Sequence, residues 1–458
     1  MNQRSNFTSK IGFVLAAAGS AVGLGNLWRF PYLAAQHGGG TFLLVYLILA
    51  VTFGFTLMIA EIAIGRKTGL SAIGAFKALD KRFGFLGFLA SAVPIIILPY
   101  YCVIGGWVSK FFATYAISGA QTAATHTVIE GKELAYFQVF VSKIGEPIGW
   151  FCLFVGLTAI IVLFGVEKGI EKVSKVMMPV LVALTLGIAV YVVTRPSALE
   201  GVIYYLKPNF KDFSITTIFA AMGQLFYSMS LAMGIMVTYG SYMKKENHLE
   251  SSVRQIELFD TAIAFLAGLM IVPAAYPSIV NGETKPGPTL MFVTLPEVFK
   301  DMPMGSLIGA IFFLLVFLAA LTSSISLMET IVSIVMDKTK LGRKLACVIV
   351  TAFTLIVGIP SALGFNVWSH ISPLGLGDIL SFFDFVSNSV MMPIVAFFTC
   401  LIIGFVIKPK TIVDEVKATD GTFKSEKLFT VMIKWIAPVF ILGILGFSVA
   451  EGMGWITV

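Results

Sequence analysis

The chain has 458 residues, of which 57% are hydrophobic and only 12% are charged. Soluble domains carry about 25% charged residues, so the composition excludes an ordinary soluble protein and is typical of a helical protein that crosses a membrane many times. The formal net charge of +7 does not indicate a nucleic-acid-binding protein, because the basic residues gather in short loops between apolar runs, as membrane topology requires.

Apolar runs long enough to cross a bilayer predict an all-α membrane protein with eleven transmembrane helices. In chain order the predicted spans are Ile11–Ala35, Thr41–Ile64, Leu86–Ile117, Ile148–Phe164, Val176–Val193, Ile215–Tyr242, Ile256–Ile279, Ser306–Met336, Leu345–Ile359, Ile379–Ile407 and Phe429–Val449.

The loops between these spans alternate in charge. Of the 32 lysine and arginine residues, 22 fall on one side of the membrane and 7 on the other, and Arg29, Lys110 and Lys434 lie within spans. By the positive-inside rule the richer side is cytoplasmic. We therefore expect a multi-pass protein of the cell (plasma) membrane with a cytoplasmic N-terminus and, because the number of spans is odd, an extracellular or periplasmic C-terminus.

The first predicted span contains a stretch, Gly19 to Pro31, that an uninterrupted helix would not carry. It includes three glycines, Asn26 and Arg29. Peptide groups freed from a helix cost several kcal/mol each in hydrocarbon, so such a break is tolerated only where it is buried in protein or lines a polar cavity. The break would present carbonyl groups to a small hard cation and N–H groups to a carboxylate.

The sixth predicted span repeats this anomaly between Gly223 and Gly234, where small, polar and aromatic residues replace aliphatic ones. Interrupted helices at matching positions of two halves indicate an inverted-repeat transporter. We expect a single transporter domain over residues 1–458, in which helices 1–5 (residues 1–194) and helices 6–10 (residues 215–407) form a 5+5 inverted repeat. Helix 11 (residues 429–449) falls outside it.

Polar side chains within other spans are further candidates. Hydroxyl groups at Thr322 and Ser323 follow a pair of alanines, and oxygen-only ligands suit Na+, K+ or Ca2+. Glu61 is expected to support a neighbouring backbone, and Lys434 to snorkel toward water. The chain has no HExxH, GxSxG or P-loop lysine motif, so we do not expect an enzyme.

The segment Ala21-Val-Gly-Leu-Gly-Asn-Leu-Trp-Arg-Phe-Pro31, followed by Gly38-Gly-Gly40, closely resembles the neurotransmitter:sodium symporters. The match covers essentially the whole chain and is strongest with bacterial amino-acid transporters of the eleven-helix type. Members of this family are themselves the usual example of broken-helix binding sites, so the resemblance and the break are not independent observations.

The resemblance implies two sodium sites, a substrate site and two gates. The first sodium site would use Ala21, Asn26, Ser228, Asp260 and the substrate carboxylate. The second would use Gly19, Val22, Ala319, Thr322 and Ser323. The substrate would contact Ala21, Leu24, Gly25, Ile97, Tyr101, Tyr227, Ser228, Ser230, Met233, Ser323 and Leu327. The outer gate would pair Arg29 with Asp384, and the inner gate would join Arg4, Asp337, Ser241 and Tyr242.

Four positions depart from the family pattern, in three respects. Gly23 stands where members that carry biogenic amines have an aspartate, which favours a substrate with its own carboxylate. Asp260 stands where the family usually has asparagine, and Ala264 where animal members offer a serine to chloride. Phe7 replaces the usual tryptophan of the inner gate. We therefore expect chloride-independent transport, with Asp260 supplying the negative charge.

Together these features predict a symporter that imports a neutral, hydrophobic amino acid with sodium by alternating access. A proton- or potassium-coupled carrier of the same architecture is one alternative. A non-transporting amino-acid sensor or a channel is another alternative. Accumulation of substrate driven by a sodium gradient would exclude both of them.

Overall fold

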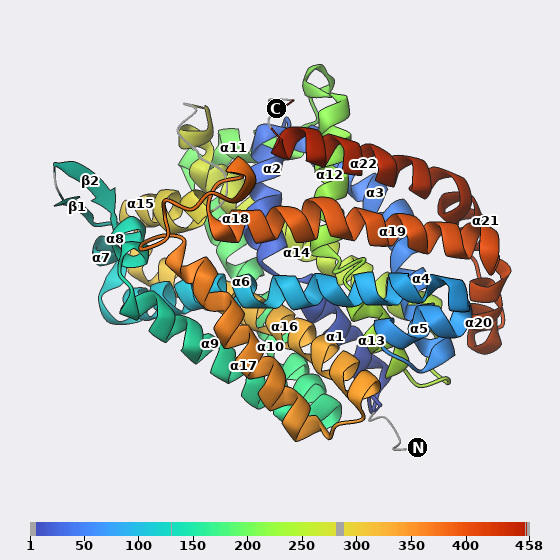
Figure 1. Ribbon diagram of the computed structural model, residues 1–458. Helices are drawn as coiled ribbons and strands as arrows, with labels where there is room; N and C mark the ends of the chain where they lie inside the picture. The colour runs from blue at the N-terminus through green and yellow to red at the C-terminus, as the bar shows by residue number, and fades with distance from the viewer. Residues whose placement is uncertain (1–5, 130, 281–287, 454, 456–458) are drawn as a thin grey trace.

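The computed structural model describes residues 6–129, 131–280, 288–453 and 455. Within these residues the fold is helical except for one antiparallel hairpin, β1 (His126–Ile129) and β2 (Lys132–Ala135), at one end of the bundle (Figure 1). The helices are α1 (Lys10–Ala21), α2 (Phe30–Gln36), α3 (Gly40–Leu49), α4 (Phe55–Thr68), α5 (Ala72–Leu79), α6 (Gly84–Ile117), α7 (Gly119–Ala123), α8 (Tyr136–Ser142), α9 (Gly145–Leu163), α10 (Lys172–Val193), α11 (Leu199–Leu206), α12 (Ile215–Ser228), α13 (Ile235–Ser241), α14 (Leu249–Val280), α15 (Leu295–Lys300), α16 (Gly305–Thr339), α17 (Arg343–Leu363), α18 (Ile379–Asp384), α19 (Met392–Leu401), α20 (Lys410–Asp420), α21 (Glu426–Val431) and α22 (Ala437–Gly452).

Shorter 3-10 and π-helical turns complete the framework. They are η1 (Gly25–Arg29), η2 (Ala50–Gly54), η3 (Lys81–Phe83), η4 (Val166–Glu171), η5 (Pro196–Ala198), η6 (Phe210–Asp212), η7 (Leu290–Thr294), η8 (Pro373–Gly375), η9 (Phe385–Met391), η10 (Ile402–Val406) and η11 (Met432–Ile436). Several join two α-helices into one span, as η2 does between α3 and α4.

Nine helices of the described residues are long and apolar enough to cross a membrane, and the bent pair Lys10–Ala21 and Gly25–Gln36 makes a tenth crossing. The predicted sixth span consists of two pieces, α12 with 14 residues and α13 with 7. The protein is therefore a multi-pass helical membrane protein, and the count of eleven stays a prediction.

The long helices α6 and α16 pack against each other through the centre of the bundle. They are the most buried spans, whereas α9 on the periphery is the least buried. This contrast is expected in a bilayer, because peripheral helices expose apolar side chains to lipid instead of covering them with protein.

Close helix packing around the second break depends on glycine. A Cβ atom at Gly65 of α4 would overlap the carbonyl oxygen of Val237, and one at Gly240 of α13 would overlap the carbonyl oxygen of Ile62. Each helix thus brings its backbone against the other, as small residues allow in membrane bundles.

Gly240→Ala is accordingly expected to destabilise the protein by about 1–3 kcal/mol, because the added methyl group forces α13 away from α4. A lower midpoint of thermal unfolding in detergent would show this. Gly187→Ala in α10 is the matched control, since a Cβ there meets no atom within 4 Å. Equal midpoints for the two variants would contradict the role assigned to this contact.

Candidate functional site

The first break separates α1 from η1 and α2, which are bent by 50°. Val22 has an extended backbone (φ −72°, ψ 100°), which ends α1. The Asn26 side-chain oxygen then accepts a hydrogen bond from the N–H of Gly23 (3.2 Å), and the Gly23 carbonyl accepts one from the Asn26 N–H (3.2 Å). Asn26 therefore fixes the shape of the turn through these two hydrogen bonds.

The second break runs from Met229 to Gly234 and uses left-handed backbone at Ser230, Ala232 and Gly234 (φ 53°, 59° and 68°). Ser230 and Ala232 carry a Cβ, so left-handed backbone is unfavourable there unless contacts with the surrounding protein stabilise it. The carboxylate of Glu61 accepts the freed N–H of Ala232 at 2.7 Å, which is the supporting role expected of Glu61. The sequence predicted irregularity from Gly223 onward, but residues up to Ser228 remain helical.

The two breaks lie side by side. The Ser230 hydroxyl donates to the Ser20 carbonyl at 2.9 Å, and the two serine hydroxyls are 3.1 Å apart. Residues 210 positions apart in the chain thus share one polar centre inside the membrane protein.

A fully buried polar cluster lies beside this centre. The Ser228 hydroxyl is 2.7 and 2.8 Å from the two carboxylate oxygens of Asp260, and the Asn26 amide nitrogen is 2.8 Å from one of them. The Tyr46 hydroxyl is 3.2 Å from the other. All four side chains are 0% exposed. Sequence reasoning missed Tyr46, which lies in an apolar run with no irregularity to mark it.

No lysine, arginine or histidine nitrogen lies within 4.0 Å of the Asp260 carboxylate among the residues that the structure describes. A buried carboxylate surrounded only by neutral donors is costly unless a cation or a proton compensates its charge. Nor do the described residues contain three or more His, Cys, Asp or Glu side chains placed so that together they could hold a metal ion. The ligands here are oxygen atoms, which suit a hard monovalent or alkaline-earth cation.

A second group of oxygen atoms lies where α1 meets α16. The Ser323 hydroxyl is 3.5, 3.1 and 3.4 Å from the carbonyl oxygens of Gly19, Ser20 and Val22. The Thr322 hydroxyl donates to the Ala319 carbonyl (3.0 Å) on its own helix. The structure thus brings the five residues Gly19, Val22, Ala319, Thr322 and Ser323 to one place, from segments about 300 residues apart.

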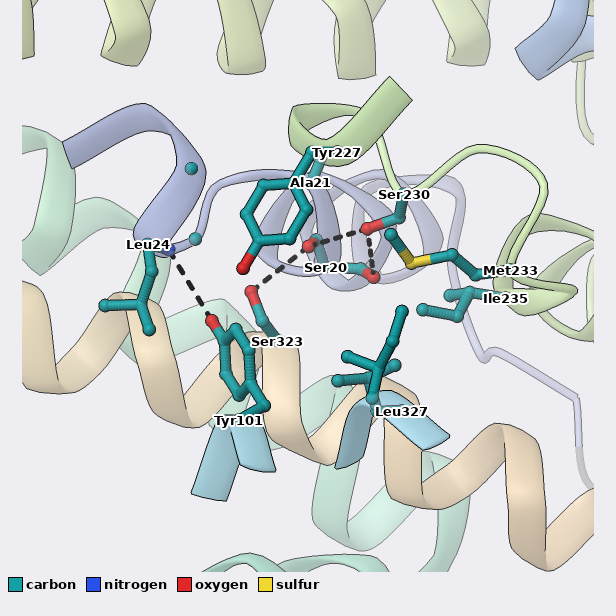
Figure 2. Close-up of a pocket in the computed structure, with 13 residues that line it drawn as sticks. Ser20, Ala21, Leu24, Tyr101, Tyr227, Ser230, Met233, Ile235, Ser323 and Leu327 are labelled. Carbon is teal, nitrogen blue, oxygen red and sulfur yellow. Dashed lines mark hydrogen bonds between the residues drawn. The ribbon is translucent and has the colours of Figure 1, made fainter. Parts of the chain in front are cut away.

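A pocket lies between the breaks (Figure 2). Of the eleven predicted substrate-binding residues, ten line it; Ser228 lies in the Asp260 cluster instead. Its lining is Ser20, Ala21, Gly23, Leu24, Gly25, Ile97, Tyr101, Tyr227, Ser230, Met233, Ile235, Ser323 and Leu327. Ser20, Gly23 and Ile235 also line the pocket but were not among the predicted substrate-binding residues, although each lies in or beside a break that the sequence shows.

The pocket is polar at one end and apolar at the other. The Tyr101 hydroxyl lies 3.5 Å from the Leu24 N–H, at the start of the second half of helix 1. Figure 2 shows Met233, Ile235 and Leu327 gathered at the opposite end. The pocket therefore offers N–H and O–H donors to an anionic group and an apolar surface to a hydrophobic one.

Two glycines keep the polar end open. A Cβ at Gly23 would lie 2.6 Å from the Ser323 hydroxyl oxygen and 3.2 Å from the Tyr101 hydroxyl oxygen, and a Cβ at Gly25 would lie 2.6 Å from the Tyr227 ring. Any side chain at position 23, including an aspartate, would enter the space beside these hydroxyl groups.

The expected outer gate residues lie above the pocket without a direct ion pair between Arg29 and Asp384. The Arg29 guanidinium lies over the Tyr227 ring at 5.7 Å from its centroid. Asp384 instead accepts hydrogen bonds from the Tyr100 hydroxyl (3.2 Å) and the Asn388 amide (2.6 Å).

Of the four residues expected at the inner gate, Arg4 lies outside the described residues. Asp337 accepts hydrogen bonds from the N–H and hydroxyl of Ser71 (3.0 and 2.5 Å), and the Tyr242 hydroxyl donates to Glu329 at 2.8 Å. The Ser241 hydroxyl donates to the Thr238 carbonyl at 2.6 Å.

Phe7, which was also expected at the inner gate, is fully buried. Its ring packs edge-on against Phe13, Tyr239 and Tyr242 with centroids 5.6, 5.6 and 6.3 Å apart. The phenylalanine ring, which is smaller than the tryptophan usual at this position in the family, is therefore enclosed by aromatic neighbours.

The sequence profile described as the Sodium:neurotransmitter symporter family matches residues 4–132 and 118–454. The chain belongs to this family. It is 33% identical over 452 residues to an uncharacterized sodium-dependent transporter of Haemophilus influenzae, covering 96% of this chain and 97% of the relative. It is 34% identical over 444 residues to the uncharacterized sodium-dependent transporter YhdH of Bacillus subtilis, covering 95% and 96%.

More distant and structural relatives agree with the assignment. The human sodium- and chloride-dependent GABA transporter 2 is 26% identical over 467 residues, covering 92% of this chain and 76% of the relative. The crystal structure of MhsT in complex with L-phenylalanine matches with a TM-score of 0.86 and 34% identity, covering 97% of this chain and 100% of that chain. The protein is thus a sodium-dependent transporter of this family and not an enzyme. The predictions of a sodium-dependent transporter and of a protein that is not an enzyme are both confirmed.

Proposed function

We propose that this transporter carries a neutral, hydrophobic amino acid into the cell together with sodium. The observation that carries the proposal is the Asp260 carboxylate, buried among neutral oxygen and nitrogen groups beside a broken helix. Such a carboxylate needs a positive charge next to it, and a cation bound there would lie beside the polar end of the pocket.

The first sodium site consists of the Asp260 carboxylate, the Ser228 hydroxyl, the Ala21 carbonyl, the Asn26 side chain and the carboxylate of the substrate. The Asn26 amide nitrogen points toward Asp260 at 2.8 Å. A cation would require this amide to rotate so that its oxygen replaces the nitrogen, since only the oxygen can act as a ligand.

The second site uses the carbonyl oxygens of Gly19, Val22 and Ala319 with the hydroxyl groups of Thr322 and Ser323. Its support is the approach of the Ser323 hydroxyl to three carbonyl groups from the end of α1. Helix C-termini favour cations because their carbonyl dipoles point outward.

The substrate is an amino acid because the pocket offers one anion-binding end and one apolar end. Its carboxylate would meet the Leu24 and Gly25 N–H groups and the Tyr101 hydroxyl, and its side chain would lie against Ile97, Met233 and Leu327. Methionine adapts to different shapes, so aliphatic and aromatic side chains both fit this lining. MhsT, the structural relative described above, was solved with L-phenylalanine.

The cycle follows from an inverted repeat of helices 1–5 and 6–10 with the N-terminus in the cytoplasm. Sodium orders the two breaks and completes the carboxylate site, after which Tyr227 and the Arg29–Asp384 region close the outer side. Release of the second sodium inward loosens the inner side around Asp337 and Phe7. Each sodium that moves inward gains roughly 2.3 kcal/mol per 100 mV of membrane potential.

Uptake of radiolabelled amino acids into proteoliposomes tests the function. An inward sodium gradient is expected to drive accumulation, and hydrophobic amino acids from a panel of twenty are expected to compete, whereas aspartate and lysine do not. Replacement of sodium by choline should abolish uptake.

A buried carboxylate such as Asp260 can also be compensated by a proton, which keeps a proton-coupled carrier as the second candidate. Uptake that persists without sodium and collapses when an ionophore removes the pH gradient would support this candidate and overturn the sodium-coupled one. Substrate binding without any uptake would instead indicate a sensor.

A further inference from the structure

A groove with a volume of about 350 Å³ lies between α20 and the beginning of the last span, away from the transport pathway. Figure 1 shows α20 and α21 together beyond the end of α19. The charged side chains that line the groove are Lys408, Lys410, Lys417 and Lys434, with Asp414 and Glu426.

The groove carries an uncompensated positive charge. Lys417 and Glu426 neutralise each other in an ion pair of 2.6 Å. Over the described ranges, no carboxylate oxygen lies within 4.0 Å of the other three lysines. Three ammonium groups therefore surround one cavity with a single further acid, Asp414. Such an arrangement attracts an anion.

The wall of the groove is held rigidly in place. Glu415 of α20 accepts hydrogen bonds from buried Arg66 at 3.0 Å and from Lys245 at 2.8 Å. At the end of α20, Asp420 accepts the N–H groups of Leu249 and Glu250 at 3.1 and 3.0 Å. The lysines on this helix are thus presented by a backbone fixed to α4 and α14, which lowers the entropic cost of binding a ligand.

Aromatic side chains place the groove at the level of lipid headgroups. The Lys434 ammonium lies 5.1 Å from the Trp435 ring centroid and 5.8 Å from that of Phe405. Trp435 is 60% exposed and Phe405 is 49% exposed, and both lie on helices long and apolar enough to cross a membrane. Tryptophan is enriched at the membrane–water interface, and lysines at the ends of spans extend toward it.

We propose that this groove binds the phosphodiester headgroup of an anionic phospholipid. The three ammonium groups hold the phosphate, and the acyl chains run along Phe405 and Trp435 toward the bilayer. A zwitterionic phospholipid is bound less well, because the lysines repel its quaternary ammonium group. The binding requires neither the amino acid nor sodium, so it is independent of the proposed function.

Lipid binding to the purified protein in detergent tests the assignment. Native mass spectrometry would count bound phosphatidylglycerol and phosphatidylcholine during titration. The wild type is expected to prefer phosphatidylglycerol. The triple variant Lys408→Gln, Lys410→Gln, Lys434→Gln is expected to bind it on the order of a hundredfold more weakly, because each lysine near the surface attracts an anionic lipid by electrostatics.

The matched control is the triple variant Lys67→Gln, Lys77→Gln, Lys81→Gln, which removes the same charge from exposed lysines around α5. It should keep the wild-type affinity. Equal loss in both triple variants, or equal binding of the two lipids by the wild type, would overturn the proposal. Displacement of phosphatidylglycerol by inorganic phosphate at the same concentration would assign the groove to a soluble anion instead. If the groove variant does not fold, Lys410→Gln alone, at an exposed position, should still weaken binding about fivefold.

Discussion

Asp260→Asn is expected to raise the sodium concentration needed for half-maximal uptake by at least about a hundredfold. The substitution keeps the shape of the side chain but removes the one negative charge in the fully buried cluster with Asn26 and Ser228. Breaking a buried charge pair costs about 3–5 kcal/mol, and each 1.4 kcal/mol is a factor of ten in affinity. Sodium titrations of amino-acid uptake into proteoliposomes measure the shift.

Glu257→Gln is the control for this variant. Glu257 lies one turn earlier on α14 and pairs with Arg254 at 3.1 Å, outside the cluster. Loss of the Glu257 charge should leave the sodium concentration for half-maximal uptake within about twofold of the wild-type value, because this charge is already compensated by arginine.

The wild type should transport equally well when chloride is replaced by gluconate, since Asp260 itself supplies the negative charge. A collapse of wild-type uptake in gluconate, or an unchanged sodium dependence in Asp260→Asn, would refute this role.

Gly23→Ala is expected to abolish detectable binding of the amino acid while the protein remains folded. The new methyl group would lie 2.6 Å from the Ser323 hydroxyl oxygen and 3.2 Å from that of Tyr101. It would fill the polar end of the pocket, where the substrate carboxylate is proposed to meet the Leu24 N–H. A misplacement of about 1 Å in such a site costs on the order of a hundredfold. Scintillation proximity binding with a radiolabelled amino acid measures the loss.

Gly187→Ala provides the comparison, because it adds the same methyl group to a helix where no atom lies within 4 Å. It should bind substrate like the wild type. Thermal unfolding of both variants separates loss of binding from loss of fold. Wild-type affinity in Gly23→Ala would show that the substrate carboxylate does not occupy this space.

The break in the first span could be predicted from residues because three glycines and a buried asparagine are expensive in hydrocarbon unless they line a polar site. The observed bend of 50° is where this argument placed it. The second break is narrower than its composition suggests. Polar and aromatic residues before Met229 satisfy their backbone groups within α12 and face inward without unwinding it.

The arrangement of side chains around the gates could not be predicted in the same way. The resemblance to the symporter family implied an outer gate that pairs Arg29 with Asp384. In the structure Asp384 accepts hydrogen bonds from Tyr100 and Asn388, and Arg29 lies over Tyr227. Which partner a buried charge selects depends on distances between helices that are far apart in the chain, and the sequence contains no direct measure of them.

The sequence by itself determined that this protein crosses a membrane many times, that one span is interrupted between Gly19 and Pro31, and that oxygen atoms rather than thiols or imidazoles are available around the interruption. These properties follow from local costs: the transfer of residues into lipid and the need of each peptide group for a hydrogen-bond partner. Only the tertiary structure decided that Tyr46 joins Asn26, Ser228 and Asp260, and that lysines of α20 and the last span share a groove. Both depend on helix packing, which brings together side chains that no local pattern connects.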